Sequence, residues 1–206
     1  MELLLTDEQA MLRDSAATFA KRRGGAERLR GLAAASTRID RTLWRDAAEA
    51  GWLAILAPAS AGGLGLGLTE LCLVAQELGR NLIPEPVAAV AAVARALGTS
   101  EIAGAAIAGE SIVLPALMEG PRATGDEPPA LAADPDGDAW LLDGIKTGVL
   151  FPADADGFLV SASADAGIVL VHATEAEIIA SDVVDGSSVG LLTFNGWALD
   201  GYIKVF

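Results

Sequence analysis

The pattern of the sequence changes at Glu110, and this change constrains the fold more than any other feature. Before Glu110, apolar residues recur every three or four positions, which predicts helices at about 6–22, 26–35, 40–50, 70–80, 86–97 and 100–108. After Glu110, short apolar segments are separated by Asp-Gly and Asn-Gly pairs, which favour tight turns between strands. The sequence therefore predicts an α+β chain: a helical domain at 1–109, then an antiparallel barrel or sandwich at 110–206.

The strands expected in the second half lie between these turn pairs. Pro115 stands inside the first of them and predicts an edge strand or a bulge, because proline has no N–H to donate to a neighbour. Residues 120–135 contain four prolines among small and acidic residues and are expected to form a loop. The expected strands are 112–117, 139–142, 145–151, 158–162, 168–173, 189–194 and 202–206.

Several of the predicted helices have capping residues at their ends. Thr6 and Gln9 have the spacing of a capping box at the start of the first helix. Asp40 and Thr69 stand where a side-chain oxygen could accept from the first turn of a helix. Gly51 follows the helix at 40–50 and suits the left-handed position that ends a helix.

Charge is distributed unevenly along the chain, which has a formal net charge of −14. Residues 101–206 contain 17 acidic and three basic residues, whereas the first half is nearly balanced. Such an acidic half repels phosphates, so we expect no nucleic-acid partner. The longest alanine and valine run, 87–94, is far shorter than the roughly 20 residues of a membrane span. The N-terminus has no basic segment typical of a signal peptide, so we expect a cytoplasmic protein without membrane insertion.

Glycines are concentrated at residues 62–67, just before the helix at 70–80. Their spacing does not match a dinucleotide-binding fingerprint, and no strand–loop–helix unit surrounds them. We interpret the segment as a structural loop that lets backbone pass close to its neighbour. The following helix has one apolar stripe, formed by Leu71, Val74, Ala75 and Leu78.

This region resembles the N-terminal helical domain of acyl-CoA dehydrogenases. The matching residues are Gly51-Trp52, Pro58, Gly62-Gly63, Gly65 and Glu77-Leu78-Gly79-Arg80, with Leu43-Trp44 upstream. Further along, Asp143-Gly144-Ile145-Lys146 resembles the entry to the β domain of that family, and Phe194-Asn195-Gly196 resembles a later turn. The resemblance extends over nearly all of the chain. It implies that residues 110–206 form the antiparallel β-barrel domain that is the middle domain of the family, and that the family's C-terminal four-helix bundle is missing.

The resemblance implies FAD-linked α,β-dehydrogenation of an acyl-CoA thioester. In that family a glutamate removes the α proton and the flavin accepts the β hydrogen as hydride; most members carry this glutamate in the bundle, so no catalytic residue is assigned. Two segments that meet the flavin correspond to Met118-Glu119 and to Gly148-Val149-Leu150, where the aromatic ring and the hydroxyl of the family pattern are replaced. The resemblance also implies that Leu71, Ala75 and Leu78 contact the acyl chain.

Two functions remain open at this level. The chain could be a truncated or degenerate acyl-CoA dehydrogenase subunit that needs a homo- or hetero-oligomeric partner and has little activity alone. It could instead be a non-catalytic protein- or lipid-binding scaffold with the same fold. The stripe at 71–78 and the almost wholly apolar helix at 86–97 have few neighbours to cover them, which predicts exposed patches and self-association or a partner chain.

The remaining candidate residues favour ordinary structural roles. A single histidine, His172, lies at the end of an apolar strand without a serine or acid in a partner motif. Cys72, the single cysteine, excludes an internal disulfide, makes a Cys/His zinc site improbable and is expected to be a packed thiol. Asp134, Asp136 and Asp138 alternate as in a calcium loop, but Pro135 interrupts them, so we expect a solvated turn.

Overall fold

The computed structural model describes residues 4–35, 37–120, 127–137, 139–165, 167–183, 185, 187–199 and 203–205, with side chains up to residue 196. Two compact units divide the chain. The helical unit comprises Met1–Thr99 and Ala103–Glu110, and the β unit comprises Ser100–Ile102 and Ser111–Phe206. Among the described helices, none combines the length and the apolar content that crossing a bilayer requires.

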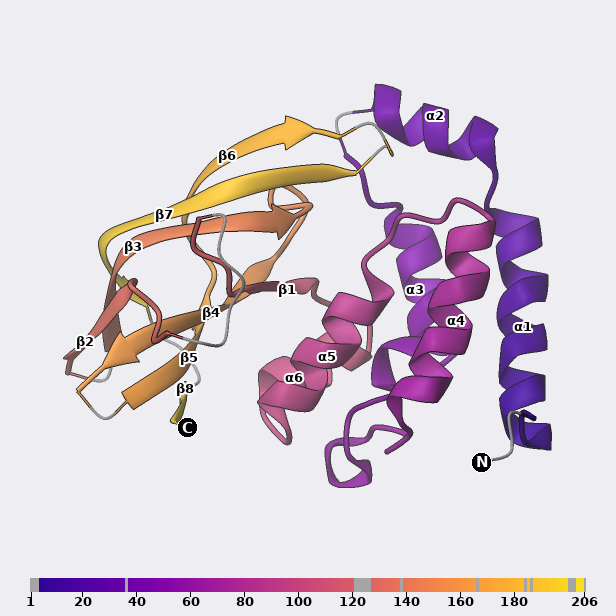
Figure 1. Cartoon of the computed structure of the whole chain (residues 1–206), viewed down its shortest axis with the longest axis horizontal. Helices are drawn as coiled ribbons and strands as arrows, with labels where there is room; N and C mark the ends of the chain where they lie inside the picture. The colour runs from indigo at the N-terminus through magenta and orange to yellow at the C-terminus, as the bar shows by residue number, and fades with distance from the viewer. Residues whose placement is uncertain are drawn as a thin grey trace. The chain divides into compact units, whose positions relative to one another are not determined.

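The described residues of the helical unit form six α-helices and two short 3-10 helices, and α1 packs along α4 (Figure 1). Its elements are α1 (Asp7–Arg23), α2 (Ala26–Ala34), α3 (Arg41–Glu49), η1 (Trp52–Ala54), η2 (Ala59–Ala61), α4 (Leu68–Arg80), α5 (Val87–Leu97) and α6 (Glu101–Ile107), the last of which begins in the β unit. The predicted helices are therefore confirmed, with shifts of a few residues at their ends.

The capping predictions are confirmed at two helices and wrong at a third. Thr6 and Gln9 form the capping box of α1, and the Asp40 carboxylate accepts from the N–H groups of the first turn of α3. Thr69 is not a cap, because α4 begins one residue earlier at Leu68. There the Glu70 carboxylate accepts from Gly67 N–H at 2.9 Å and from the Gln9 amide at 2.7 Å, which joins the starts of α1 and α4.

The expectation of uncovered apolar faces on α4 and α5 is wrong. Leu71, Val74 and Leu78 are buried, and six of the eleven residues of α5 are buried as well. Contacts with α1, η1 and one another cover the two helices. The outward positions of α5 include the small Ala88 and Ala92, so the helix is apolar without presenting a large apolar patch. Self-association can no longer be argued from these two faces.

The glycine-rich loop is structural, as predicted. Its backbone runs beside the preceding apolar segment, with Leu64 N–H donating to Ala54 O and Leu66 N–H to Ile55 O, both at 2.9 Å. A Cβ atom on Gly63 would lie 2.1 Å from the Ala57 carbonyl oxygen, so only glycine fits there. The loop therefore closes the core around residues 52–57, all of which are buried.

The described strands of the β unit form a curled sheet of eight strands in the order β6-β7-β3-β2-β4-β5-β8, with β1 paired to β4 (Figure 1). The strands are β1 (Val113–Ala116), β2 (Ala132–Asp136), β3 (Ala139–Leu150), β4 (Gly157–Ala164), β5 (Gly167–Ala173), β6 (Glu177–Asp182), β7 (Ser188–Leu199) and β8 (Ile203–Val205). The sheet is mixed rather than wholly antiparallel, because β4 pairs in parallel with both β1 and β2. Pro115 lies in β1, which has one ladder partner among the described strands, in agreement with the predicted edge position.

Two strands were not predicted. β2 lies inside the segment expected to be a loop, and it tolerates Pro135 near its end while pairing with β3. β6 follows β5 after a short turn and pairs with β7. Each strand pairs with the strand that directly follows it in the chain, but neither shows a regular apolar alternation that could have identified it.

Two Asx-Gly pairs expected to form turns instead lie within long strands. Asp143-Gly144 lies inside β3, and Asn195-Gly196 lies inside β7. Asn195 pairs with Asp143, whereas Gly196, with φ of 68°, is an extra residue that has no partner in the β3–β7 register. A second register shift follows between Lys146 and Val149, where β3 gains one residue relative to β7. Glycine at φ > 0 is typical of bulges in antiparallel pairs. The two bulges cancel, so pairing beyond them returns to its original register.

Candidate functional site

The segments that the resemblance places at the flavin lie side by side in the β unit. Thr147 N–H donates to Met118 O at 2.8 Å, and the Thr147 hydroxyl donates to Gly120 O at 3.3 Å. Met118 and Thr147 form an isolated antiparallel bridge. The segment at 118–120 is therefore fixed against the bulged part of β3, although the two are far apart in sequence.

Glu119 joins these segments through its carboxylate. It accepts from the N–H groups of Ala130 at 2.5 Å and Leu131 at 3.1 Å, and it forms an ion pair with Lys146. The Lys146 ammonium group is fully buried and also donates to the Ser161 hydroxyl at 3.0 Å. Both Glu119 carboxylate oxygens are thus engaged in contacts inside the protein, so Glu119 would contact a flavin through its main chain.

Burial and the mutual pairing of Glu119 and Lys146 both shift the pKa values of these two groups. Burial raises the pKa of Glu119, but the hydrogen bonds from Lys146, Ala130 and Leu131 outweigh it and hold the pKa below its ordinary value. Burial lowers the pKa of Lys146, and the Glu119 carboxylate opposes that effect only in part. A buried cation needs a paired anion. Glu119 supplies that anion, and Lys146 keeps Glu119 ionised.

Gly148, Val149 and Leu150 lie in different surroundings. Gly148 has φ of 66°, and a Cβ built on it would contact the Met118 sulfur at 3.4 Å. Val149 is buried in the core, whereas Met118 and Leu150 are 40% and 47% exposed. Of the five predicted flavin-binding residues, Met118 and Leu150 therefore have the most exposed side chains. Both of these side chains are apolar.

A flavin fits this part of the chain only incompletely. The main-chain frame of the two segments is present, but Gly148 offers no ring to pack on an isoalloxazine and Leu150 offers no hydroxyl to bond it. An aromatic residue at 148 would also have to adopt a left-handed backbone conformation, which is unfavourable for any residue with a Cβ. The described residues of this site do not form a complete flavin-binding site by themselves.

The three residues predicted to contact the acyl chain lie on α4 in the helical unit. Leu71 and Leu78 are buried, and Ala75 is half-buried. Packing of α1 along α4 explains their burial. Their contact with an acyl chain remains a prediction.

The other candidate residues take structural or solvent-exposed positions. Cys72 is exposed, so the expectation of a packed thiol is wrong, because Cys72 lies off the buried stripe of α4. His172 on β5 is half-buried, and burial lowers its pKa. Asp134 and Asp136 are exposed on β2, and Asp138 lies outside the described residues. No group of metal-ligating side chains is present among the described residues.

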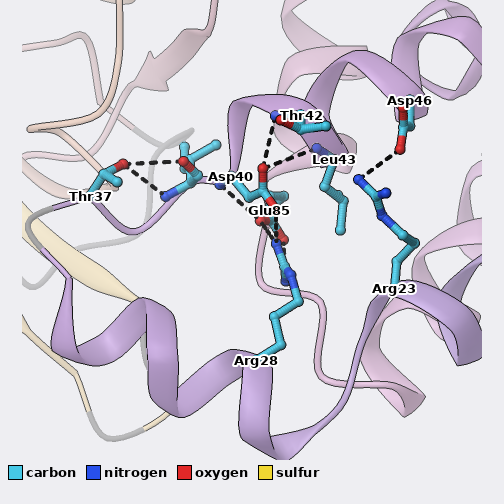
Figure 2. A network of polar contacts seen from close by, with 9 residues as sticks. Arg23, Arg28, Thr37, Asp40, Thr42, Leu43, Asp46 and Glu85 are labelled. Carbon is cyan, nitrogen blue, oxygen red and sulfur yellow. Dashed lines mark hydrogen bonds and ion pairs between the residues drawn. The ribbon is translucent and has the colours of Figure 1, made fainter.

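The helical unit holds a second buried charge that the sequence did not reveal (Figure 2). The Glu85 carboxylate is fully buried in the segment between α4 and α5 and pairs with Arg28 of α2. It also accepts from Asp40 N–H at 3.2 Å, while the Asp40 carboxylate caps α3. Burial opposes ionisation of Asp40, but the backbone N–H groups of α3 and the charge of Arg28 lower its pKa. This network joins α2, α3 and the α4–α5 connection.

A family model named "Acyl-CoA dehydrogenase, N-terminal domain" matches residues 6–108, which is half of the chain. The chain belongs to the acyl-CoA dehydrogenase family. The acyl-CoA dehydrogenase FadE27 of Mycobacterium tuberculosis is 35% identical over 181 residues, covering 82% of this chain and 47% of that protein. The chain thus spans about half the length of this curated relative.

Solved acyl-CoA dehydrogenase structures extend the match to the β unit. The Tcur3481-Tcur3483 steroid ACAD G363A variant is 32% identical with a TM-score of 0.80, covering 95% of this chain and 56% of that chain. The ChsE4-ChsE5 complex from Mycobacterium tuberculosis is 29% identical with a TM-score of 0.81, covering 97% of this chain and 57% of that chain. The predicted family and its two-part fold are confirmed by these comparisons.

Proposed function

We propose that this chain is the flavin-poor subunit of a two-chain acyl-CoA dehydrogenase. The reaction class is α,β-dehydrogenation of an acyl-CoA thioester, with FAD and the catalytic base held mainly by an unlike partner chain of the same family. The single observation that carries this proposal is the contrast at the candidate site. The frame of Met118, Glu119 and Lys146 is intact, whereas positions 148 and 150 no longer offer a ring or a hydroxyl.

The structural neighbours support an unlike partner. One is a complex of ChsE4 with ChsE5, and another is a steroid ACAD named for two components, Tcur3481 and Tcur3483. A subunit that keeps the fold but loses flavin contacts agrees with such an arrangement. The steroid ACAD among them makes acyl-CoA thioesters with bulky ring systems the first substrates to test.

The experiment is purification of the chain alone and after co-expression with acyl-CoA dehydrogenase chains of the same organism. We expect the chain alone to be colourless and inactive. We expect one co-expressed pair to retain FAD and to reduce an artificial electron acceptor when acyl-CoA is added. Leu150→Asp should lower the flavin content of that pair, because it places a charge at the exposed edge of the site. Ile168→Asp is the matched control, a partly exposed aliphatic residue on β5.

A non-catalytic scaffold is the second candidate function, favoured by the same loss of flavin-contacting side chains. It predicts a colourless protein under both conditions, with no acyl-CoA-dependent reduction in any pair. A yellow and active preparation of the chain alone would contradict both proposals.

A further inference from the structure

α1 presents one exposed side to solvent. It packs along α4, and the side opposite the exposed one contains Ala16 and Ala20, which are fully buried (Figure 1). The exposed residues recur at steps of three and four positions, so they form a single stripe along the helix. We call this stripe the outer face of α1, and its members are Asp7, Glu8, Met11, Asp14, Ser15, Thr18, Lys21 and Arg22.

Charge is divided along the outer face. Asp7 and Glu8 lie in the first turn of α1, and Lys21 and Arg22 lie in its last turn. None of these four side chains forms an ion pair with another described residue. The arrangement suits the dipole of α1 itself, and it also makes the face complementary to its own antiparallel copy. A second α1 that runs in the opposite direction places its basic turn against the acidic turn of the first.

The positions of these charges fix the register of such a pair. A two-fold axis midway between residues 14 and 15 places each position opposite the one that lies equally far beyond the midpoint in the second copy. Glu8 then lies near Arg22 of the second copy, and Asp7 lies near Lys21 of the second copy. The symmetry repeats both contacts, so every charge at the two ends meets an opposite charge. A parallel pair would instead place like charges opposite each other at both ends, which is unfavourable.

Asp14 is the charge nearest the axis, where the two copies come close to each other. Its carboxylate is already paired with Arg13 of its own chain at 2.7 Å, which reduces the repulsion between the two copies of Asp14. Ser15, also next to the axis, adds a hydroxyl that can donate to the Asp14 carboxylate of the second copy. The repulsion in the middle is therefore weaker than the attraction of the ion pairs at the two ends.

The same register provides an apolar contact between the charged ends. Met11 is 73% exposed, and it lies beside Thr18 of the second copy. Thr18 borders an open cleft of about 460 Å³ that Phe19 and Trp52 also line. The rings of Phe19 and Trp52 meet edge to face with their centroids 4.8 Å apart, and a methionine sulfur packs favourably against aromatic rings. The Met11 side chain of each copy therefore has a cleft to enter in the other.

We propose that the outer face of α1 binds the outer face of a second copy of this chain in antiparallel orientation. Ion pairs at both ends set the direction and register, and Met11 of each copy enters the cleft at Phe19 and Trp52 of the other. An interface limited to one helix per chain is smaller than the roughly 1,200–2,000 Å² that stable complexes bury, so we expect a weak dimer. The proposal uses no residue of the candidate site and does not depend on flavin binding or on an unlike partner.

The test is sedimentation of the full chain over a range of concentrations, with two charge-reversed variants. Asp7→Lys with Glu8→Lys makes the outer face basic at both ends, and Lys21→Glu with Arg22→Glu makes it acidic at both ends. Each variant alone should self-associate about tenfold or more weakly than the unchanged chain at low salt. The two variants mixed together should form a dimer again, because each end then meets an opposite charge. Added sodium chloride should weaken the dimer of the unchanged chain.

Matched controls separate the outer face from general effects of charge and apolar surface. Asp165→Lys with Glu175→Lys makes the same charge change at two exposed residues of the β unit and should leave self-association unchanged. Met11→Ala should weaken the dimer, and Ile168→Ala, at a partly exposed aliphatic residue of β5, should not.

A milder pair of variants keeps the test valid if a charge reversal unfolds α1. Glu8→Gln and Arg22→Gln should each weaken the dimer, and the double variant should be no weaker than either one, because both remove the same ion pair. Three results would overturn the proposal. The first is a chain that stays monomeric at its highest soluble concentration in low salt. The second is a dimer that the charge reversals leave intact. The third is a pair of folded, oppositely reversed variants that do not associate when mixed.

Discussion

Lys146 on β3 is fully buried and forms an ion pair with Glu119, which lies 27 residues earlier in the chain. This pair holds the two segments of the candidate site together. The Glu119 carboxylate also accepts hydrogen bonds from the backbone N–H groups of Ala130 and Leu131. Four separate parts of the β unit thus meet at one buried contact, because Ser161 of β4 accepts from the same ammonium group.

Removal of Lys146 should destabilise the β unit strongly. Lys146→Met leaves the Glu119 carboxylate without its cation, and breaking a buried ion pair in this way costs about 3–5 kcal/mol. Adding Glu119→Gln to Lys146→Met should recover part of that loss, because the unpaired charge is removed. Urea unfolding of the two single variants and the double variant gives the coupling energy. Simple additivity of the two single effects would show that the pair is not a unit.

The pair should also make stability depend on pH in the acid range. The folded pKa of Glu119 lies below its unfolded value, which is about 4.3. Its contribution is therefore fully present above the unfolded pKa and is lost as pH falls through the folded pKa. The difference in unfolding free energy between the unchanged chain and Glu119→Gln should shrink as pH falls in this window. A constant difference across the titration would contradict this role of the charge.

Arg28 should contribute far more to the stability of the helical unit than Arg13 does. Its partner Glu85 has a fully buried carboxylate, so Arg28→Met should cost about 3–5 kcal/mol of unfolding free energy. Arg13→Met is the control, because Arg13 and Asp14 form an exposed pair whose loss should cost about 0–1 kcal/mol. Similar effects of the two substitutions in chemical unfolding would mean that the Arg28–Glu85 contact does not organise α2.

Two glycines should respond in opposite ways to alanine. Gly63→Ala places a Cβ against the Ala57 carbonyl oxygen and should destabilise the helical unit by about 1–3 kcal/mol or more. Gly79→Ala lies within α4 with no atom near the added Cβ and should stabilise it by about 0.5–1 kcal/mol. Thermal unfolding of both variants tests the prediction, and a stabilised Gly63→Ala variant would show that the loop does not lie against residues 54–57.

The sequence predicted the helical unit well because its signals are local. The Thr6–Gln9 capping box and the Asp40 cap each depend on residues within one turn, and apolar periodicity, cap residues and glycine breaks together identified the described α-helices. The burial of α4 and α5 was predicted wrongly. Their apolar residues pack against η1 and α1, and the positions of these elements depend on tertiary packing that local sequence does not show.

The β unit and the candidate site were harder to predict, because their local signals are weak or ambiguous. β2 and β6 form hairpins with the strands that follow them but have no regular apolar alternation, and an Asp-Gly pair has the same local preference in a bulge as in a turn. The resemblance indicated the segments at 118–119 and 148–150, and the structure brings them together. Neither spacing nor composition could predict that Glu119 would bind Lys146, because that contact joins separate strands.

The two cancelling bulges of β3 and β7 have a consequence for how the gene of this protein can change. Each extra residue, Gly196 in β7 and one of the two at 147–148 in β3, lies between paired positions, so loss of its codon would remove that bulge without moving the residue pairs on either side. Lys146 would stay opposite Leu192 and inside the unit. A codon lost between the bulges would instead move the positions beyond it by one and turn their side chains to the other face. Single-residue deletions in these two strands should therefore be tolerated during evolution at the bulges and not between them.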